Sequence, residues 1–226
     1  MSRYLDLDRW PRRRAFDYFR GFDNPFFNVA VQLDATPLRE LTRERPEVSF
    51  FLAYLYLSLK SANETEPFRY RIDGERVRVH ERIHGGTTFL RDDESFDFAY
   101  FDYLEDYPRF QAGAREALDT AQRRGPTFDP HDGRDDLIHY SALPWIAFTS
   151  FAHARNWRRP DSIDSIPKIV FGRCAEEGGR WRLPVSVEVH HALMDGLHVG
   201  RYLERFQADL LAPETSLSGL REEARR

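Results

Sequence analysis

The sequence predicts an α/β (α+β) fold, a two-layer sandwich in which helices pack on a mixed β-sheet, built as one domain over residues 1–226. The chain has 226 residues, of which 41% are hydrophobic, and this is enough to bury a sizeable core. Helical and strand-like patterns interleave along it without strict β-α-β regularity, which favours helices and strands that share one core. No internal repeat and no Gly/Ser-rich linker divides the chain.

Strands are predicted where apolar and polar residues alternate over short runs. The clearest signal is a hairpin at 68–81, in which two alternating runs meet at Asp73-Gly74. Two strands are also predicted within 137–153, interrupted at Pro144. The other predicted strands span 4–8, 26–36, two runs within 87–102, and the pair 166–174 and 180–189.

Helices are predicted from apolar residues at helical spacing and from residues typical of helix ends. Thr36 would cap a helix over 36–46, with Pro37 at its first helical position. The segment 49–64 is apolar nearly all round, which predicts a buried helix. Further helices are expected at 11–22, 107–125 and 197–212; the run 91–94 is interpreted as an exposed turn, and the tail from about residue 213 as loose.

The composition argues against several classes of partner. The formal net charge is −4 and the pI is about 6.1, so no electrostatic footprint for nucleic acid is present. The single cysteine, Cys174, excludes an internal disulfide framework and a cysteine-based zinc site. No run approaches the roughly 18 apolar residues of a membrane span, and no apolar export segment follows the arginines at 12–14. We therefore expect a cytoplasmic protein with neither a nucleic-acid nor a membrane partner.

The segment EVHHALMDGLHV, residues 188–199, is the strongest candidate for a catalytic site. His190 and His191 stand where the strand pattern ends and the next helix begins, and such junctions expose side chains on a rigid scaffold. Asp195 follows four residues after His191, so one helical turn would place both on the same face. A neutral imidazole is close to the ideal general base at neutral pH, which makes His191 the candidate base.

Two other interpretations of this segment are open. His190 could as readily be a packed histidine that is hydrogen-bonded in the core. His190, His191 and Asp195 could instead be metal ligands. Adjacent residues on a strand point to opposite faces, so the two imidazoles would rarely converge on one ion. We expect no metal.

The motif H-H-x-x-x-D-G in this segment resembles the signature of the chloramphenicol acetyltransferase family. Three further stretches resemble that family at similar spacing, and together the likeness spans about residues 4–211: LDRWPRRRAFDYF at 7–19, FRYRIDGERVRVHE at 68–81 and SALPWIAFTSF at 141–151. Related condensation domains are about twice as long, and 2-oxo acid dehydrogenase cores carry Asp-His-Arg where this chain has Val-His-His. The likeness is therefore to the first family.

The resemblance implies that the chain moves the acetyl group of acetyl-CoA to a hydroxyl of chloramphenicol by direct attack, without an acyl-enzyme. His191 matches the family's base, and its second ring nitrogen would donate to the histidine's own carbonyl. Ser141 matches the donor that stabilises the oxyanion, although a serine that merely ends a strand is the simpler alternative. Acetyl-CoA would be a cosubstrate, with no cofactor bound permanently.

The resemblance also implies an ion pair between Asp195 and Arg12 that fixes the turn of the base, rather than a Ser-His-Asp triad. It implies a homotrimer whose active sites lie between subunits. Tyr18, Phe19, Phe89 and Phe148 would line the acceptor pocket, although core packing is an equal alternative for each. Trp145 and Arg173 would contact CoA.

Two positions depart from the family pattern in ways that concern the acceptor. Val170 stands where a threonine is expected to hold a water, and Phe19 where a tyrosine is common. Loss of these hydroxyls could redirect the choice of acceptor, because buried hydrogen-bonding groups discriminate strongly between substrates. Acetyl transfer to another alcohol or amine, and a non-catalytic ligand-binding trimer, therefore remain alternatives.

Overall fold

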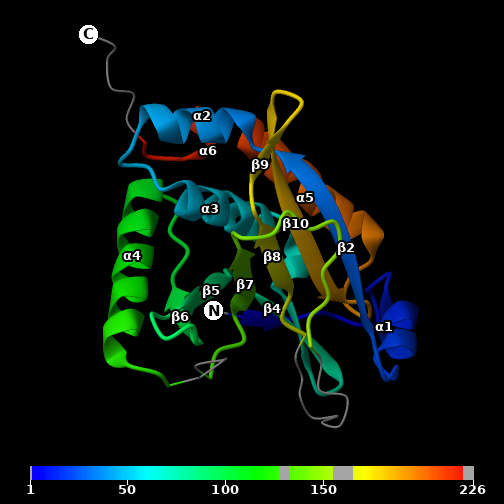
Figure 1. The fold of residues 1–226 in the computed structure, drawn as a ribbon. Helices are drawn as coiled ribbons and strands as arrows, with labels where there is room; N and C mark the ends of the chain where they lie inside the picture. The colour runs from blue at the N-terminus through cyan, green and yellow to red at the C-terminus, as the bar shows by residue number, and fades with distance from the viewer. Residues whose placement is uncertain (1, 128–132, 155–164, 221–226) are drawn as a thin grey trace.

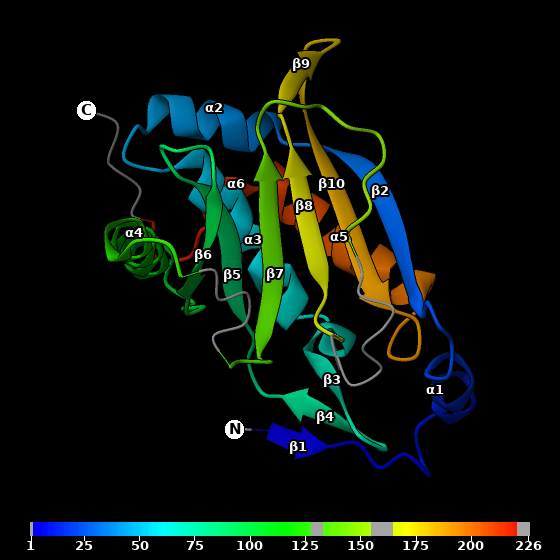
Figure 2. The same cartoon turned by 60° about the horizontal axis from the view of Figure 1, so that its bottom comes forward.

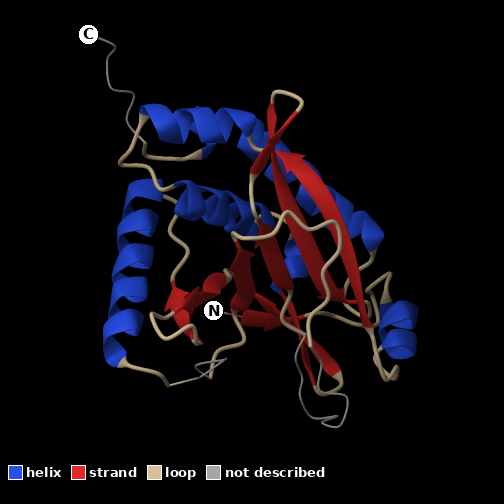
Figure 3. Ribbon diagram, in the orientation of Figure 1, coloured by secondary structure: helices blue, strands red, loops and turns tan. Residues whose placement is uncertain are grey.

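The centre of the molecule is a mixed β-sheet covered on one face by helices, as Figures 1 and 3 show for this computed structural model. The structure describes residues 2–127, 133–154 and 165–220. The strands are β1 (Ser2–Tyr4), β2 (Phe26–Asp34), β3 (Tyr70–Asp73), β4 (Arg76–His80), β5 (His84–Leu90), β6 (Phe96–Phe101), β7 (Leu137–Leu143), β8 (Lys168–Gly172), β9 (Ala175–Glu177) and β10 (Arg180–His190). The helices are α1 (Arg13–Phe19), α2 (Thr36–Glu44), α3 (Phe50–Asn63), α4 (Tyr107–Arg124), α5 (Gly196–Leu211) and α6 (Pro213–Ser216), with a 3₁₀ turn η1 (Glu66–Arg69).

The strands form two sheets. The main sheet has seven strands in the order β2-β10-β8-β7-β5-β6, with β9 paired to β10. Its β5–β7 and β7–β8 pairings are parallel and the others are antiparallel, so the predicted mixed sheet and the α/β class are confirmed. The predicted hairpin forms the smaller sheet, of order β1-β4-β3, and its two loop residues are Gly74 and Glu75, because Asp73 pairs with Arg76. Gly74 has a φ of 57°, which favours glycine at the first loop position.

Helices α2, α3, α5 and α6 lie on one side of the main sheet, and α4 lies beside β6 (Figures 1 and 2). The prediction that 49–64 is a buried helix is confirmed, since Leu55, Leu57 and Leu59 of α3 are fully buried. They belong to one core cluster with Ile169 of β8 and Val187 of β10. Alternation along each strand therefore turns the odd-numbered residues of β8 and β10 toward the helices and the even-numbered ones toward the opposite face.

The segment after β7 crosses that opposite face without forming a second strand, so this part of the prediction is wrong. Residues 145–154 pass over β8 and β10 toward β2 (Figures 1 and 2). Side chains of the sheet hold this segment instead of a ladder: Gln32 donates to the Phe148 carbonyl at 2.8 Å, and Ser186 to the Phe151 carbonyl at 3.5 Å. Apolar and polar residues alternate in residues 145–154 because one side of the segment is buried against the sheet, not because the segment is a strand of it.

Three smaller expectations at element ends are also wrong. The first strand covers Ser2–Tyr4 and not 4–8, because the chain turns after Leu5. Ala35, not Thr36, caps α2, and the Thr36 hydroxyl instead accepts from the backbone N–H of Trp181 at 2.8 Å. The tail is not loose from residue 213, since residues 213–216 form α6 and Leu217 is 1% exposed in the core. Residues 221–226 lie outside the described part.

The exposed turn predicted at 91–94 is confirmed for residues 92–94, whereas Arg91 forms a buried ion pair with Asp97 outside the turn. The Arg91 side chain is 10% exposed and lies 2.6 Å from the fully buried Asp97 carboxylate. Arg91 also donates to the carbonyls of Ala121 and Gly125 at the end of α4. The pair therefore connects the β5–β6 hairpin to α4.

No helix in the described ranges is long and apolar enough to cross a membrane.

Candidate functional site

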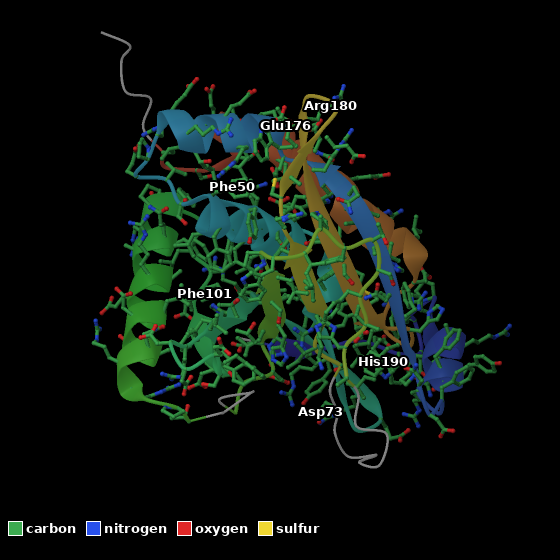
Figure 4. All side chains as sticks on the ribbon, in the orientation of Figure 1. Phe50, Asp73, Phe101, Glu176, Arg180 and His190 are labelled. Carbon is green, nitrogen blue, oxygen red and sulfur yellow. The ribbon has the colours of Figure 1, made fainter. Side chains whose placement is uncertain are left out.

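His191 lies on the turn between the end of β10 and the start of α5, as predicted. Figure 4 shows His190 at the end of β10 that adjoins α1, and Arg180 at the other end of the strand. Four residues separate His190 from Asp195, the N-cap of α5, whose carboxylate accepts from the backbone N–H of Leu197 at 3.1 Å. A capped helix start and a buried strand thus fix both ends of the turn.

The imidazole of His191 is held by one hydrogen bond and two aromatic rings. Its Nδ1 lies 3.2 Å from the Met194 carbonyl oxygen. Because a carbonyl only accepts, this contact assigns the hydrogen to Nδ1 and leaves the lone pair on Nε2. Phe19 stacks on the ring at a centroid distance of 3.9 Å and an angle of 11°, and Phe27 lies at 4.8 Å. The expected acceptor, His191's own carbonyl, is wrong, since Nδ1 contacts the Met194 carbonyl instead; the His191 carbonyl accepts from Arg12 Nη2 at 2.9 Å.

Arg12 and Asp195 form the expected ion pair across the turn. Arg12 Nη1 donates to Asp195 Oδ2, and the Arg12 side chain is 16% exposed. Burial tends to raise the pKa of the Asp195 carboxyl, but the Arg12 guanidinium, His198 and the backbone N–H groups of α5 outweigh it, so the pKa is held below its usual value. A single guanidinium therefore fixes both the backbone of His191 and the cap of α5.

His198 also contacts Asp195, although sequence reasoning did not single it out. Its Nδ1 accepts from the backbone N–H of Asp195 at 3.1 Å and completes a capping box at the start of α5. Burial lowers the pKa of His198, and the nearby Asp195 carboxylate only partly opposes this. Its position three residues after an N-cap aspartate is the signal that could have identified it.

His190 has the alternative role that was weighed for it, in the packing of the core. It is 7% exposed, its Nδ1 accepts from the Ala192 N–H at 3.2 Å, and its ring meets Phe26 edge-on at 4.9 Å. Within the ranges that the structure describes, no group of three or more His, Cys, Asp or Glu side chains is arranged to hold a metal ion.

Ser141 lies on β7, on the face of the sheet opposite the helices. It is half-buried, pairs with Val170 of β8, and its hydroxyl accepts from Thr88 Oγ1 at 3.2 Å. Val170 is fully buried. Since Thr88 shares a face with Ser141, its neighbour Phe89 points to the helix side, where Arg91 lies over the Phe89 ring at 5.2 Å. Phe89 thus lies on the opposite face of the sheet from Ser141, and its place in the acceptor pocket stays a prediction.

Within one chain, Ser141 and His191 are far apart. The sheet register places Ser141 level with Val170 and with Ser186 of β10. His191 follows Ser186 by five residues and lies two strands from β7, which is roughly 16 Å along the strands and about 10 Å across them. No single copy of this chain brings the candidate base and the candidate oxyanion donor together.

The remaining predicted residues divide between these two regions. Tyr18 lies 5.1 Å from Phe19 on the His191 side and is 65% exposed. Phe148 is buried and meets Phe151 at 5.9 Å. On the Ser141 side, Trp145 is 59% exposed, and Arg173 follows β8, with its backbone N–H donating to the Ile146 carbonyl at 2.8 Å. The two predicted CoA contacts therefore belong to one surface, beyond the ends of β7 and β8.

A polar pocket of about 530 Å³ lies away from all of these residues. It is lined by Ser2, His80, Glu81, Arg82, His84 and Asp136, at the edge where the small sheet meets the starts of β5 and β7. Burial lowers the pKa of His84, and the neighbouring Asp102 and Asp136 carboxylates only partly oppose this. We assign the pocket no part in the candidate chemistry, because it contains neither Ser141 nor His191.

Comparison with known proteins gives a consistent family. The family model described as "Chloramphenicol acetyltransferase" matches residues 2–207. Curated chloramphenicol acetyltransferases are similar along nearly the whole chain: that of Proteus mirabilis is 30% identical over 209 residues, covering 90% of this chain and 92% of its own, and that of Campylobacter coli is 28% identical over 211 residues, covering 92% and 97%. The resemblance drawn from the motifs is confirmed.

Solved structures agree with the sequence comparisons. A chloramphenicol acetyltransferase superposes with a TM-score of 0.80 at 28% identity, covering 93% of this chain and all of the other. The dihydrolipoamide acetyltransferase of Azotobacter vinelandii superposes with a TM-score of 0.65 at 17% identity, covering 96% and 92%, and shares the fold.

Proposed function

Because the chain belongs to the chloramphenicol acetyltransferase family, we propose that it moves the acetyl group of acetyl-CoA to a hydroxyl of chloramphenicol. Family membership makes the chain an acyltransferase enzyme. The names of its relatives support the acceptor, and the geometry around His191 supports the chemistry. The donor and the acceptor are substrates, and the proposal requires no permanently bound cofactor.

The geometry of His191 is the observation that carries the proposal. With its Nδ1 hydrogen directed to the Met194 carbonyl, Nε2 has the lone pair needed to take a proton from the acceptor hydroxyl. An alcohol is too weak an acid to ionise at neutral pH, so the base removes its proton as the new C–O bond forms. General-base catalysis of this kind contributes typically about 10²–10⁴ in rate.

Ser141 serves in this mechanism as a donor to the oxyanion, not as a nucleophile. In its hydrogen bond within the chain the Ser141 hydroxyl accepts from Thr88 Oγ1, which leaves its own hydrogen available for donation to an oxyanion. Attack of the hydroxyl on the thioester creates a negatively charged oxygen, which the Ser141 hydroxyl can stabilise. Loss of one such donor commonly costs about 10²–10³ in rate. The oxyanion then collapses, breaking the C–S bond, and the CoA thiolate that leaves takes up the proton held by His191. The acetyl group thus passes directly to the acceptor, without an acyl-enzyme.

A complete site requires two copies of the chain, and we propose a homotrimer. The separation of roughly 19 Å between Ser141 and His191, from the strand geometry above, is too large for both to touch one reacting group. An interface that joins the His191 end of one sheet to the Ser141 end of the next would bring them together. His191 and the aromatic residues around it would then come from one subunit. The surface predicted to contact acetyl-CoA, at Trp145 and Arg173, would come from its neighbour. We place this trimer in the cytoplasm, where the lone Cys174 would remain reduced.

The residues around the acceptor also support a second candidate function, in which the same acetyl transfer uses another acceptor. Phe19 stacks on His191 without offering a hydroxyl, and Val170 is an apolar neighbour of Ser141. With Tyr18 and Phe148 as further walls, such a pocket favours an apolar acceptor and provides few polar groups to select one. Another alcohol or an amine is therefore the alternative substrate, and a binding trimer without turnover is a weaker alternative, because it would not need the base.

The test is release of free CoA thiol from acetyl-CoA in the presence of chloramphenicol, for the wild-type protein and for His191→Ala. We expect release that depends on the acceptor and falls at least about 10²-fold in the variant. If the wild-type protein releases thiol only with another alcohol or amine, the acceptor in our proposal is wrong. If His191→Ala is folded and keeps full activity, the base is wrong.

A further inference from the structure

Thr88, on β5, lies beside Ser141 on the face of the sheet opposite the helices. Strands β5 and β7 pair in parallel, with Thr87 opposite Tyr140. The next residues along the two strands, Thr88 and Ser141, are therefore neighbours as well. Tyr140 faces the helices, because its hydroxyl lies 3.1 Å from Ser58 Oγ of α3. Side chains alternate along a strand, so Thr88 and Ser141 both point away from the helices.

A hydrogen bond between side chains joins the two strands where their backbone pairing stops. The pairing of β5 with β7 ends at Thr87 and Tyr140, whereas β7 continues to pair with β8. One residue further on, Thr88 Oγ1 donates to Ser141 Oγ at 3.2 Å. The partner of Ser141 on β8 is Val170, whose side chain has no polar atom. Among the residues that the structure describes, Thr88 is therefore the one hydrogen-bond partner of the Ser141 hydroxyl.

The direction of this hydrogen bond decides where the hydrogen of Ser141 can point. A hydroxyl has one hydrogen and two lone pairs, and it rotates to suit its partners. Because Ser141 accepts from Thr88 through a lone pair, its own hydrogen cannot point toward Thr88. Both side chains are half-buried on the same face of the sheet. The bond thus removes the orientations of the Ser141 hydroxyl that would direct its hydrogen back into β5.

The donor atom of Thr88 is itself held in place by the sheet. Threonine is branched at Cβ, which restricts its χ1 angle and suits it to a strand. On its other side β5 pairs with β6, where Thr88 is opposite Phe98. The hydroxyl of Thr87 donates to the Thr88 carbonyl at 3.2 Å. Thr88 Oγ1 is therefore a fixed point from which the Ser141 hydroxyl can be oriented before any substrate binds.

We propose that Thr88 is a positioning residue for Ser141, and that its hydroxyl keeps the Ser141 hydrogen directed at the oxyanion. This inference rests on the proposed function, in which Ser141 is the oxyanion donor. Thr88 does not touch the reacting atoms and acts through Ser141. A donor that is oriented in advance needs no reorganisation as the negative charge develops. A hydroxyl that accepts a hydrogen bond is also a better donor, by roughly 10–30% per bond.

The first experiment measures kcat and KM for Thr88→Val, which keeps the shape of threonine and removes the hydroxyl. We expect kcat to fall about 5-fold, as for the loss of one neutral hydrogen bond, with the KM values of both substrates unchanged. Thr88→Ser retains the hydroxyl and should keep most of kcat. Thr87→Val is the matched control, because Thr87 is 1% exposed on the helix side of the same strand, and it should leave kcat unchanged. A kcat that rises in Thr88→Val would overturn the proposal, since Ser141 would then donate to Thr88.

A double-mutant cycle tests whether Thr88 acts through Ser141. In the Ser141→Ala background, Thr88→Val should lower kcat no further, because the hydroxyl that Thr88 orients is already missing. An equal loss in both backgrounds would overturn the proposal. If Ser141→Ala keeps the wild-type activity, the oxyanion donor of the proposed function is wrong. If Ser141→Ala is impaired and Thr88→Val is fully active, only the role of Thr88 is wrong.

Crystal structures of the wild-type protein and of Thr88→Val provide a measurement that does not depend on turnover. We expect one rotamer of Ser141 in the wild-type protein and more than one in the variant, where nothing holds the hydroxyl. The same single rotamer in both structures would overturn the positioning role. If no acceptor supports turnover, the proposed function fails, while these structures still decide whether Thr88 orients Ser141.

Discussion

At the scale of single residues, the guanidinium of Arg12 binds both the beginning and the end of the turn that carries His191. Arg12 binds the Asp195 carboxylate through one nitrogen and the His191 carbonyl through another. Asp195 in turn caps α5 and contacts His198. The position of the candidate base thus depends on two charged side chains that contact the turn and not the His191 ring, and we propose Arg12 and Asp195 as positioning residues.

Asp195→Asn tests this positioning role. Removal of one charge leaves the Arg12 guanidinium, 16% exposed, without its counter-ion. We expect kcat to fall about 10-fold with little change in KM, and the free energy of unfolding to fall by about 1–3 kcal/mol. Asp17→Asn on α1 removes an exposed pair with Arg13 and should change neither quantity. An Asp195→Asn protein that is less stable but fully active would show that the pair only stabilises the fold.

At the scale of elements, the Arg91–Asp97 pair fastens the β5–β6 hairpin to the end of α4. Burial would raise the pKa of Asp97, but Arg91 and the backbone N–H groups of Phe98 and Thr127 outweigh it and lower the pKa to about 2. A carboxyl whose pKa is lowered by folding stabilises the protein above its unfolded value and loses that contribution as the pH falls toward the folded value. The stabilisation should therefore disappear between about pH 4 and pH 2.

Asp97→Asn measures this contribution. At pH 7 we expect the variant to be less stable than the wild-type protein by about 2 kcal/mol in urea unfolding, because a buried charge-assisted bond is lost. The two stability curves should converge as the pH falls below about 3, where the wild-type carboxyl takes up its proton. Asp92→Asn in the exposed turn is the matched control. A difference that stays constant down to pH 2 would contradict the assignment of Asp97 as the titrating group.

At the scale of the whole molecule, the proposed mechanism can use both Ser141 and His191 only if they come from two subunits, because they are far apart within one chain. Variants in each residue test this directly when they are mixed. Chains with His191→Ala and chains with Ser141→Ala should each be nearly inactive alone. When mixed trimers are assembled from equal amounts, about a quarter of the interfaces would join an intact His191 to an intact Ser141. Recovery of about that fraction of activity supports the shared site, and no recovery from confirmed mixed trimers would exclude it.

Most elements, and the position of His191 on the turn between a strand and a helix, were predicted from the sequence, because their signals are local. The period of the apolar residues and the glycine of the 73–76 turn fix strands and helices within a few positions. The motif identifies Arg12, His191 and Asp195 through family likeness. The face of Phe89 and the distance of Ser141 from His191 depend on strand register, which no local pattern contains. The strand predicted after Pro144 fails for a related reason, since burial on a sheet and pairing within it give the same alternation.

The bond between Arg12 and Asp195 joins positions 183 residues apart in the chain. Arg12 is synthesised early and Asp195 much later, so Arg12 lacks this counter-ion during most of the synthesis of the chain. The turn that carries the base can close only when nearly the whole polypeptide has emerged. An incomplete chain, ending before residue 195, can therefore build much of the sheet and still have no positioned base. The candidate base is therefore among the last features of the site to be positioned.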